Sequence, residues 1–149
     1  TLSPSSAASD VYKRQDSSIV PARSLGYGLP NAPTEPFRPL PDGDLWEFPI
    51  LVLKIDGLRV PCGGGFYMRM LPLRLLKIAI RASNRRGAPA VIYVHNWEVD
   101  DPRFIPAPPG CELRLRTGVG EPVLRKIKAL LSEFKFTSFR DFLEREGLI

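Results

Sequence analysis

The sequence contains only one histidine, His95, and only two cysteines, Cys62 and Cys111, among its 149 residues. One histidine excludes a site that this chain would build by itself from several imidazoles. Two cysteines are too few for the disulfide framework of a small secreted scaffold, and they lack the C-x-x-C spacing and nearby histidines of a zinc site. No apolar run approaches the roughly 20 residues that a membrane-spanning helix requires, so we expect no membrane span.

The composition indicates neither disorder nor a dominant charge. Hydrophobic residues make up 44% of the chain, which is enough for the packed core of one domain. The net charge is +5, and the 15 arginines outnumber the 6 lysines, which favours contacts with carboxylates and phosphates. The charges are spread along the chain, and aromatic residues do not alternate with basic ones as they do in nucleic-acid-binding surfaces. We therefore expect solvated charges and no nucleic-acid partner, with a polyanion partner as the alternative.

The first fifteen residues differ from the rest of the chain. They read TLSPSSAASDVYKRQ, which is rich in Ser and Ala and has neither an apolar period nor the layout of a signal peptide. The stretch SSAASDVYKRQ resembles a translated sequencing-adapter scar found at the ends of metagenomic reading frames. We interpret 1–15 as a non-native or disordered segment and 16–149 as the domain, and we expect nothing in 1–15 to pack.

The middle of the chain has the pattern of a strand–helix–strand unit. Residues 45–55 are apolar and β-prone, with Pro49 marking an unpaired end or edge, and 71–86 have helical spacing that ends at Gly87. The apolar run 90–94 is typical of a strand buried on both faces. Because such a unit joins parallel strands, the sequence predicts an α/β fold with a parallel sheet. The side of the helix expected to face the core consists of Leu71, Leu75, Ile78, Ala79 and Ala82.

The remaining segments are predicted from their proline, turn and capping signals. The proline-rich stretch 23–44 is predicted to be a long surface loop, because proline removes backbone donors. The other expected elements, in chain order, are a tight turn at 56–57, a returning strand over 58–61, a helix over 122–134 and a last short helix capped by Thr137 or Ser138.

His95 is the main candidate for chemistry. It directly follows the strand expected over 90–94, and active sites of parallel α/β folds form at the carboxyl ends of strands. An imidazole there can act as a general acid or base. Trp97 could form the wall of a sugar pocket, and Glu98 could orient the imidazole. The alternative is a structural histidine bonded to a loop carbonyl, and the position alone favours neither.

The Gly63-Gly64-Gly65 loop allows the backbone to approach another group closely. It lacks the G-x-x-x-x-G-K-[ST] and G-x-G-x-x-G patterns of phosphate loops, so nucleotide binding is not predicted. A loop that lines a substrate and a strained turn both stay open. Glu47, near the start of the strand over 45–55, is either a site carboxylate or a solvated strand end, and the sequence favours the second.

Several motifs occur in an order that points to one family. In chain order they are DSSIVP at 16–21, YG at 27–28, LWEFP at 45–49, PCGGG at 61–65 with Tyr67, Arg69, Leu71 and Pro72 after it, and IYVHNWE at 92–98. This order resembles the C-terminal half of a polysaccharide deacetylase with NodB homology. The subtype that it resembles is encoded beside exosortase/PEP-CTERM exopolysaccharide loci. The resemblance covers nearly all of residues 16–149.

The resemblance implies a fold, a reaction and a set of site residues. The fold is a partial (β/α) barrel of the polysaccharide deacetylase type. The reaction is the metal-dependent removal of N-acetyl groups from a glycan in bacterial exopolysaccharide biosynthesis. His95 matches the family's late histidine, which protonates the leaving amine. The substrate cleft would be formed by Trp97, Glu98, Tyr93, Trp46, Glu47, Gly63, Gly64, Gly65, Tyr67 and Arg69.

The chain also departs from the family pattern. The early motifs that supply the aspartate base and the ligands of a divalent metal, commonly zinc, are absent, as is the arginine motif that usually precedes Asp16. Asn96 stands where the subtype usually has proline, and Phe66 where it often has glycine. We therefore expect a fragment that holds no metal by itself, with a glycan substrate and the missing N-terminal half of the same enzyme as partners. A non-catalytic glycan- or polyanion-binding module and an inactive relic are the alternatives.

Overall fold

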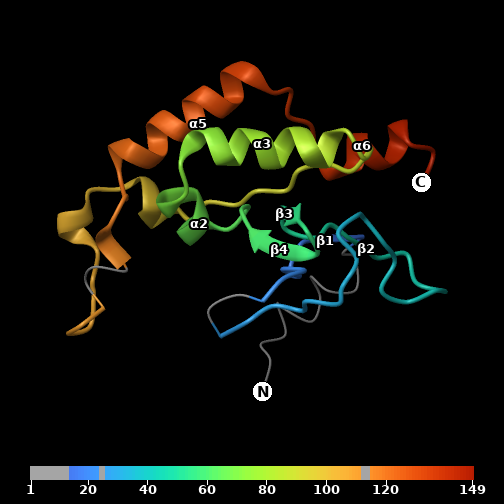
Figure 1. Ribbon diagram of the computed structural model, residues 1–149. Helices are drawn as coiled ribbons and strands as arrows, with labels where there is room; N and C mark the ends of the chain where they lie inside the picture. Colours follow the sequence, from blue (N-terminus) through green and yellow to red (C-terminus); the bar gives the residue numbers. More distant parts are fainter. Residues whose placement is uncertain (1–13, 24–25, 112–114) are drawn as a thin grey trace.

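The computed structural model describes residues 14–23, 26–111 and 115–149. Extended segments lie beneath helix α3 (Leu73–Asn84), and helix α5 (Glu121–Glu133) crosses on the outer side of α3 (Figure 1). The short helices α2 (Gly65–Met70) and α6 (Phe139–Arg145) flank the two ends of α3. The described residues thus form a small mixed α/β arrangement with short strands. None of its helices is long and apolar enough to cross a bilayer.

Three extended segments run side by side in parallel. β1 (Gln15–Asp16) pairs with β2 (Trp46–Glu47), and Ile50 forms a parallel bridge with Val91. The bridge between Ile50 and Val91 is the pairing that a strand–helix–strand unit predicts. The expected single strand over 45–55 is divided into β2 and β3 (Val52–Ile55), and the interruption contains Pro49, which has no N–H to donate to a ladder.

The prediction of a strand over 90–94 that is buried on both faces is wrong. Within this segment only Val91 is buried, and it alone forms a bridge. The N–H of Tyr93 donates to the carbonyl of Gly63 at 2.9 Å, so that a loop rather than a strand flanks this part of the segment. The N–H groups of Ile92 and Val94 lie on the edge of this segment opposite to that of Tyr93. In the described part of the chain, neither of them donates a hydrogen bond.

The expectation that nothing in 1–15 packs is wrong at its boundary. Gln15 belongs to β1, and the carbonyl of Arg14 accepts a hydrogen bond of 2.9 Å from the N–H of Trp46. A parallel ladder uses backbone groups, which any residue other than proline supplies, so the side-chain composition did not reveal this pairing. Residues 1–13 lie outside the described part of the chain, and the interpretation of their origin stays a prediction.

The expected tight turn and returning strand are confirmed. β3 pairs with β4 (Leu58–Pro61) in antiparallel register, with Val52 opposite Pro61 and Ile55 opposite Leu58. Asp56 and Gly57 connect them with φ values of 47° and 81°. Two consecutive positive φ values are typical of the two-residue hairpin turns that match strand twist. The prediction that 23–44 is an irregular loop is also confirmed for its described residues, apart from a bridge between Phe37 and Glu47.

The helix predicted over 71–86 is confirmed as α3, but its buried face differs from the prediction. Gly87 follows the helix with φ 76°, as a terminating glycine does. The buried positions are Leu76, Ala79, Ile80 and Ser83, while Ile78 is exposed. Leucine, isoleucine and alanine occupy two adjacent stripes of this helix, so the spacing alone did not distinguish the stripe that faces β3 and α5.

The two C-terminal helices agree with the prediction. α5 begins after Gly120, and its Val123 and Leu130 are fully buried. Ser138 caps α6, because its hydroxyl accepts a hydrogen bond of 3.1 Å from the N–H of Asp141. The predicted positions of both helices and the predicted cap of the last helix are therefore confirmed.

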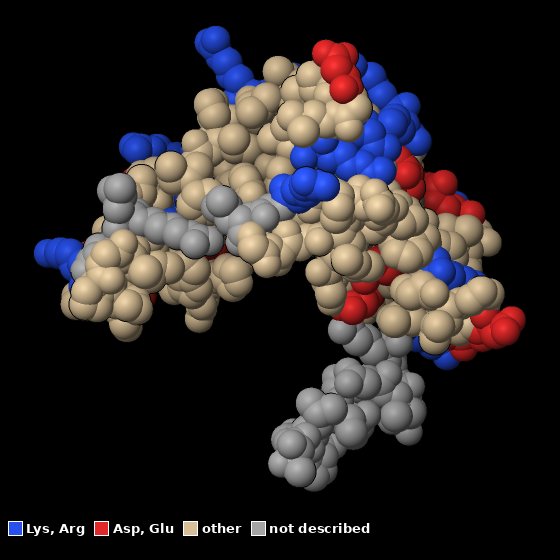
Figure 2. All heavy atoms as spheres, turned by 60° about the horizontal axis from the view of Figure 1, so that its bottom comes forward, with Lys and Arg blue, Asp and Glu red and all other residues tan. Residues whose placement is uncertain are grey.

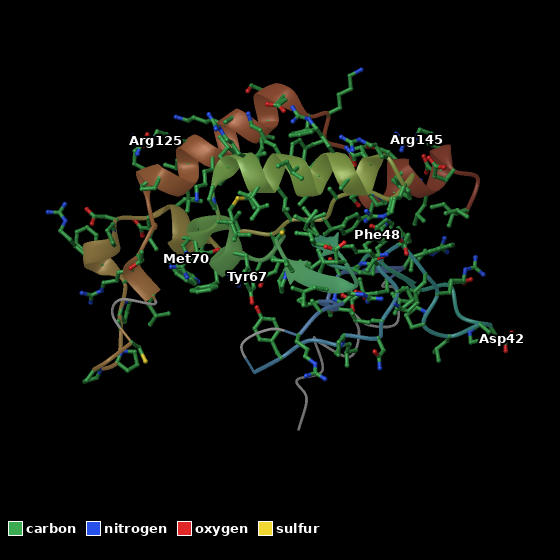
Figure 3. All side chains as sticks on the ribbon, viewed as in Figure 1. Asp42, Phe48, Tyr67, Met70, Arg125 and Arg145 are labelled. Carbon is green, nitrogen blue, oxygen red and sulfur yellow. The ribbon has the colours of Figure 1, made fainter. Side chains whose placement is uncertain are left out.

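The core has two parts. One lies between β3, α3 and α5 and contains Cys62, Met68 and Leu76. The other surrounds Phe48, whose ring stacks on Phe139 with centroids 4.2 Å apart. Figure 3 places Phe48 below the α6 end of the molecule and Tyr67 and Met70 of α2 at the opposite end. The first core supports α2 and hence the loop that precedes it.

Candidate functional site

The triple-glycine loop approaches other groups as closely as the sequence suggested. A Cβ on Gly63 would lie 2.8 Å from both the Leu51 nitrogen and a methyl carbon of Ile50. A Cβ on Gly64 would meet the Tyr93 hydroxyl at 3.0 Å. On Gly65 it would overlap with the carboxylate of Glu98. The loop thus packs against protein groups, and its last glycine makes the space in which Glu98 lies.

Glu98 connects the backbone and the side chain of His95. The short 3-10 helix η1 (Asn96–Val99) begins after His95, and Glu98 Oε2 accepts a hydrogen bond of 2.9 Å from the N–H of His95. The same oxygen lies 3.3 Å from His95 Nδ1. The Glu98 side chain is 1% exposed, whereas the His95 side chain is 52% exposed. The carboxylate therefore favours a proton on Nδ1 and leaves Nε2 accessible.

Arg69 holds the other oxygen of Glu98. Its Nε donates to Glu98 Oε1 at 2.9 Å, and this ion pair is almost completely buried. Arg69 Nη1 donates to the carbonyls of Leu115 and Thr117 at 3.1 and 2.9 Å. Buried charges require such compensation, because an unpaired charge in a protein interior is costly. Arg69, Glu98 and His95 form a continuous row from the interior to the surface.

Aromatic side chains form the walls around His95. Its ring stacks on Trp97 with centroids 5.5 Å apart and an angle of 18° between the planes, and it meets the Tyr93 ring edge-on at 5.2 Å. The guanidinium of Arg69 lies 5.2 Å from the centroid of Trp97. These groups line an open pocket of about 330 Å³, together with Tyr27, Phe66, Glu98, Pro108, Cys111 and Leu115.

The two tyrosines of the pocket interact with each other. Burial raises the pKa of the Tyr93 phenol, and its interaction with Tyr27 adds to the rise, as does the charge of Glu98. The Tyr93 hydroxyl therefore stays protonated near neutral pH and can donate a hydrogen bond. Tyr27 comes from the irregular loop over 23–44, which is thereby brought to the pocket.

A comparison with protein families decides the classification of the chain. Residues 17–144 match the model of a domain of unknown function, DUF3473. The chain belongs to the DUF3473 family. No match was found among curated proteins or among solved structures.

The structure of this DUF3473 domain brings only part of the predicted cleft together. His95, Glu98, Trp97, Tyr93 and Arg69 all line one pocket, and Gly63, Gly64 and Gly65 pack behind it. Arg69 lies behind Glu98, where its side chain is 3% exposed. The pocket thus offers aromatic faces, the imidazole and two phenols to a ligand.

Two predicted cleft residues of the DUF3473 domain, Trp46 and Glu47, do not line this pocket. Glu47 is buried, and its Oε1 accepts hydrogen bonds of 3.0 and 2.9 Å from the N–H groups of Ser18 and Ile19. The expectation of a solvated strand end is therefore wrong, because these backbone donors compensate the buried carboxylate. Trp46 lies beside Arg38, with its ring centroid 5.2 Å from the guanidinium carbon.

Tyr67, a further predicted cleft residue, is half-buried on α2 and packs edge-on against Phe66 with centroids 5.4 Å apart. Phe66 lines the pocket and Tyr67 does not. Sequence reasoning missed Tyr27, Phe66 and Leu115 as pocket residues. Their distance along the chain from His95 hides their proximity, although the Tyr27-Gly28 pair is part of the family resemblance.

The pocket residues of the DUF3473 domain do not fit a divalent metal. Within the described ranges, no group of three or more His, Cys, Asp or Glu side chains gathers at one place. His95 and Glu98 are adjacent, but both Glu98 oxygens already accept hydrogen bonds from Arg69 and from the backbone of His95. A metal ligand set needs free donor atoms that converge on one point.

A second cavity lies at the other end of the DUF3473 domain. It measures about 380 Å³ and opens between the end of α3, the connection from α5 to α6 and the segment 87–92. Its lining includes Ile80, Phe134 and Phe139 but no histidine. We take the pocket at His95 as the candidate site, because it combines an accessible imidazole with a buried charge row.

Proposed function

We propose that this DUF3473 domain is the C-terminal part of a glycan N-deacetylase and that His95 protonates the leaving amine. The observation that carries this proposal is the row Arg69–Glu98–His95, which ends at an accessible imidazole in an aromatic pocket. The resemblance described above supplies the reaction class, and the partial barrel is proposed with it.

Amide hydrolysis explains why such a histidine is needed. Water attacks the acetyl carbonyl carbon, the C–N bond breaks, and the nitrogen must take up a proton because an amide anion is a poor leaving group. In this proposal the proton comes from Nε2 of the imidazolium form of His95, and its loss leaves the neutral tautomer whose remaining proton, on Nδ1, faces Glu98. The base that accepts the proton of the attacking water belongs to the missing N-terminal half of the enzyme, and the divalent metal is held there too.

The pocket walls support a sugar ligand. Trp97, Tyr93, Phe66 and Tyr27 present aromatic faces and phenol hydroxyls, and such surfaces pack against the C–H faces of pyranose rings while hydrogen bonding to their hydroxyls. Trp97 is held by its contact with Arg69, so its orientation is set before a ligand binds.

Non-catalytic glycan binding is the second candidate, and the same aromatic walls favour it. The polyanion form of that alternative has less support. Basic and acidic side chains occur next to each other on the face shown in Figure 2. Glu133 pairs with both Lys77 and Arg81, and Glu35 contacts Lys54 and Arg86. Acidic side chains thus interrupt the basic ones on this face, although each of these two carboxylates is shared by two cations.

Acetate release from N-acetylglucosamine oligomers by the complete protein tests the proposal. A long sequencing read of the source DNA across codons 15 and 16 would supply the complete reading frame. We expect His95→Ala to lower kcat by about 10²- to 10⁴-fold with little change in KM. The control is Lys128→Ala, an exposed position on α5, which should leave the rate unchanged.

Two other outcomes would contradict the proposal. Oligomer binding by the metal-supplemented protein without acetate release would favour the binding module. Neither binding nor release would remove both candidates and leave the inactive relic.

A further inference from the structure

The contacts of Arg69 suggest a role beyond pairing two charges. Arg69 is 6% exposed, and among the described residues its guanidinium donates hydrogen bonds to Glu98 Oε1 and to the carbonyls of Leu115 and Thr117. The two carbonyls are 46 and 48 residues away from Arg69 in the chain. A planar guanidinium bound at separate points cannot rotate without breaking hydrogen bonds in a buried place. The guanidinium is therefore fixed by the fold and not by Glu98 alone.

The Glu98 carboxylate is in turn fixed between Arg69 and His95. Oε1 accepts from Arg69, and Oε2 accepts from the backbone N–H of His95. Gly65 closes a further side, where even a methyl group would overlap with the carboxylate. With both oxygens engaged, Oε2 is held 3.3 Å from Nδ1. The orientation of the imidazole thus depends on a carboxylate that is held by contacts on three sides.

We propose that Arg69 is a positioning residue for His95: by holding Glu98, it keeps the imidazole in the tautomer that carries its proton on Nδ1, with Nε2 facing the pocket. A second contact acts in the same direction, because the Arg69 guanidinium lies over the ring of Trp97, which stacks on His95. The Arg69 side chain is only 3% exposed, so it acts on His95 through Glu98 and Trp97. The inference rests on the proposed function only for the catalytic use of the tautomer.

The tautomer can be measured directly because His95 is the only histidine of the chain. The chain is labelled with ¹⁵N at histidine, and a long-range proton–nitrogen NMR correlation spectrum is recorded. The spectrum then contains one set of imidazole signals, which report which ring nitrogen carries the proton. In the neutral ring, we expect the nitrogen that carries the proton to be Nδ1. An isolated histidine side chain in water prefers the proton on Nε2, so this assignment is a signature of the Glu98 contact.

Arg69→Met is expected to shift the tautomer ratio toward Nε2–H while the far-ultraviolet circular dichroism spectrum stays that of a folded chain. Glu98→Gln is expected to shift it in the same direction. The matched control is Arg81→Met, because Arg81 also pairs with a carboxylate, Glu133, and lies over an aromatic ring, Phe134, but far from His95. The control should keep the wild-type signals.

Unchanged imidazole signals in folded Arg69→Met would overturn the inference, and so would an equal shift in Arg81→Met. Should Arg69→Met not fold, Arg69→Lys decides, because a lysine retains the charge but cannot reach Glu98 and both carbonyls at once. Unchanged signals in Arg69→Lys would then overturn it.

The measurement needs no substrate, which separates it from the test of the proposed function. A tautomer shift in Arg69→Met with an unaltered rate of acetate release would count against His95 as the proton donor. Loss of rate without a tautomer shift would count against Arg69 as its positioning residue.

Discussion

Glu98 is the residue on which the geometry of the pocket depends. Its carboxylate accepts from Arg69 and from the backbone of His95, and it lies against Gly65. A buried carboxylate with these partners is stable, whereas loss of one partner leaves a charge without compensation. The positions of Arg69 and His95 and the choice of glycine at position 65 therefore depend on Glu98, just as the position of Glu98 depends on these residues.

Gly65→Ala tests this constraint. Alanine favours a helix over glycine by up to about 1 kcal/mol, and Gly65 is the first residue of α2. The added Cβ, however, would lie only 2.5 Å from Glu98 Cδ, and overpacking of this kind costs about 1–3 kcal/mol. We expect the overlap to dominate, with a lower free energy of unfolding in urea.

The control for this substitution is Gly43→Ala. Gly43 also lacks a positive φ, and its Cβ would lie 3.2 Å from the Leu40 Cβ in a loop that can adjust. It should change stability by less than about 0.5 kcal/mol. Equal stability of Gly65→Ala and wild type would show that Glu98 has room to move.

At the scale of elements, α2 depends on α5. Six residues are too few for a helix that is stable by itself, and no side chain caps α2, whose N-cap residue is Gly64. Lys126 of α5 donates hydrogen bonds to the carbonyls of Met68, Arg69 and Leu71 at 3.0, 2.7 and 2.8 Å. A lysine at the carboxyl end of a helix donates hydrogen bonds to the free carbonyls, and its positive charge interacts favourably with the helix dipole. α5 thereby fixes the helix that carries Arg69.

Lys126→Met is expected to lower the free energy of unfolding by about 1–3 kcal/mol, because it leaves these carbonyls without their charged donor. Burial lowers the pKa of Lys126, which shows that its charge is partly desolvated in this position. Lys128→Met on the same helix is exposed and should have little effect. Chemical denaturation of both variants checks the difference, and equal stabilities would contradict it.

At the scale of the whole molecule, the parallel segments hold the two parts of the core together. Hydrogen bonds from Ile50 to Ile19 and from Leu51 to Val91 join the segments at 2.9 Å. Ile50 belongs to the core part around Phe48, and Leu51 belongs to the part under α3. Adjacent residues of one extended segment thus face different parts, so we expect the domain to unfold as a unit.

Cys62 is expected to make the free energy of unfolding decrease with rising pH in the alkaline range. It is fully buried, and burial raises the pKa of its thiol from 9.0 to about 11. Because the folded-state pKa is the higher one, the contribution of the neutral thiol is complete below pH 9 and is lost as the pH rises from 9 to about 11. The loss amounts to at most about 1.4 kcal/mol per pH unit.

The comparison of wild type with Cys62→Ala isolates this contribution, since Lys126 and Tyr93 titrate in both proteins. We expect the free energy of unfolding of wild type, measured under reducing conditions, to fall more steeply between pH 9 and pH 11. Parallel curves over this range would show that the thiol does not change its ionisation on unfolding.

Local signals were sufficient for much of the fold. The turn at Asp56-Gly57, the glycine after α3 and a cap at Thr137 or Ser138 were predicted from the residues themselves, because each requires a particular φ value or side-chain acceptor, and the structure has the cap at Ser138. The pairing of Gln15 and the break in the strand over 90–94 were not predicted. Both depend on which backbone groups meet, and backbone groups are the same for almost every residue type.

The candidate site divides in the same way. The sequence by itself determined that His95, Trp97 and Glu98 are close, since they are neighbours on one short turn. It also determined that the backbone at the triple glycine can approach another group closely. Only the tertiary structure decided that the group against Gly65 is the Glu98 carboxylate, that Arg69 lies behind this carboxylate, and that Tyr27 reaches the pocket while Glu47 does not. The physical reason is that burial and charge compensation depend on contacts between segments far apart in the chain, which residue spacing does not record.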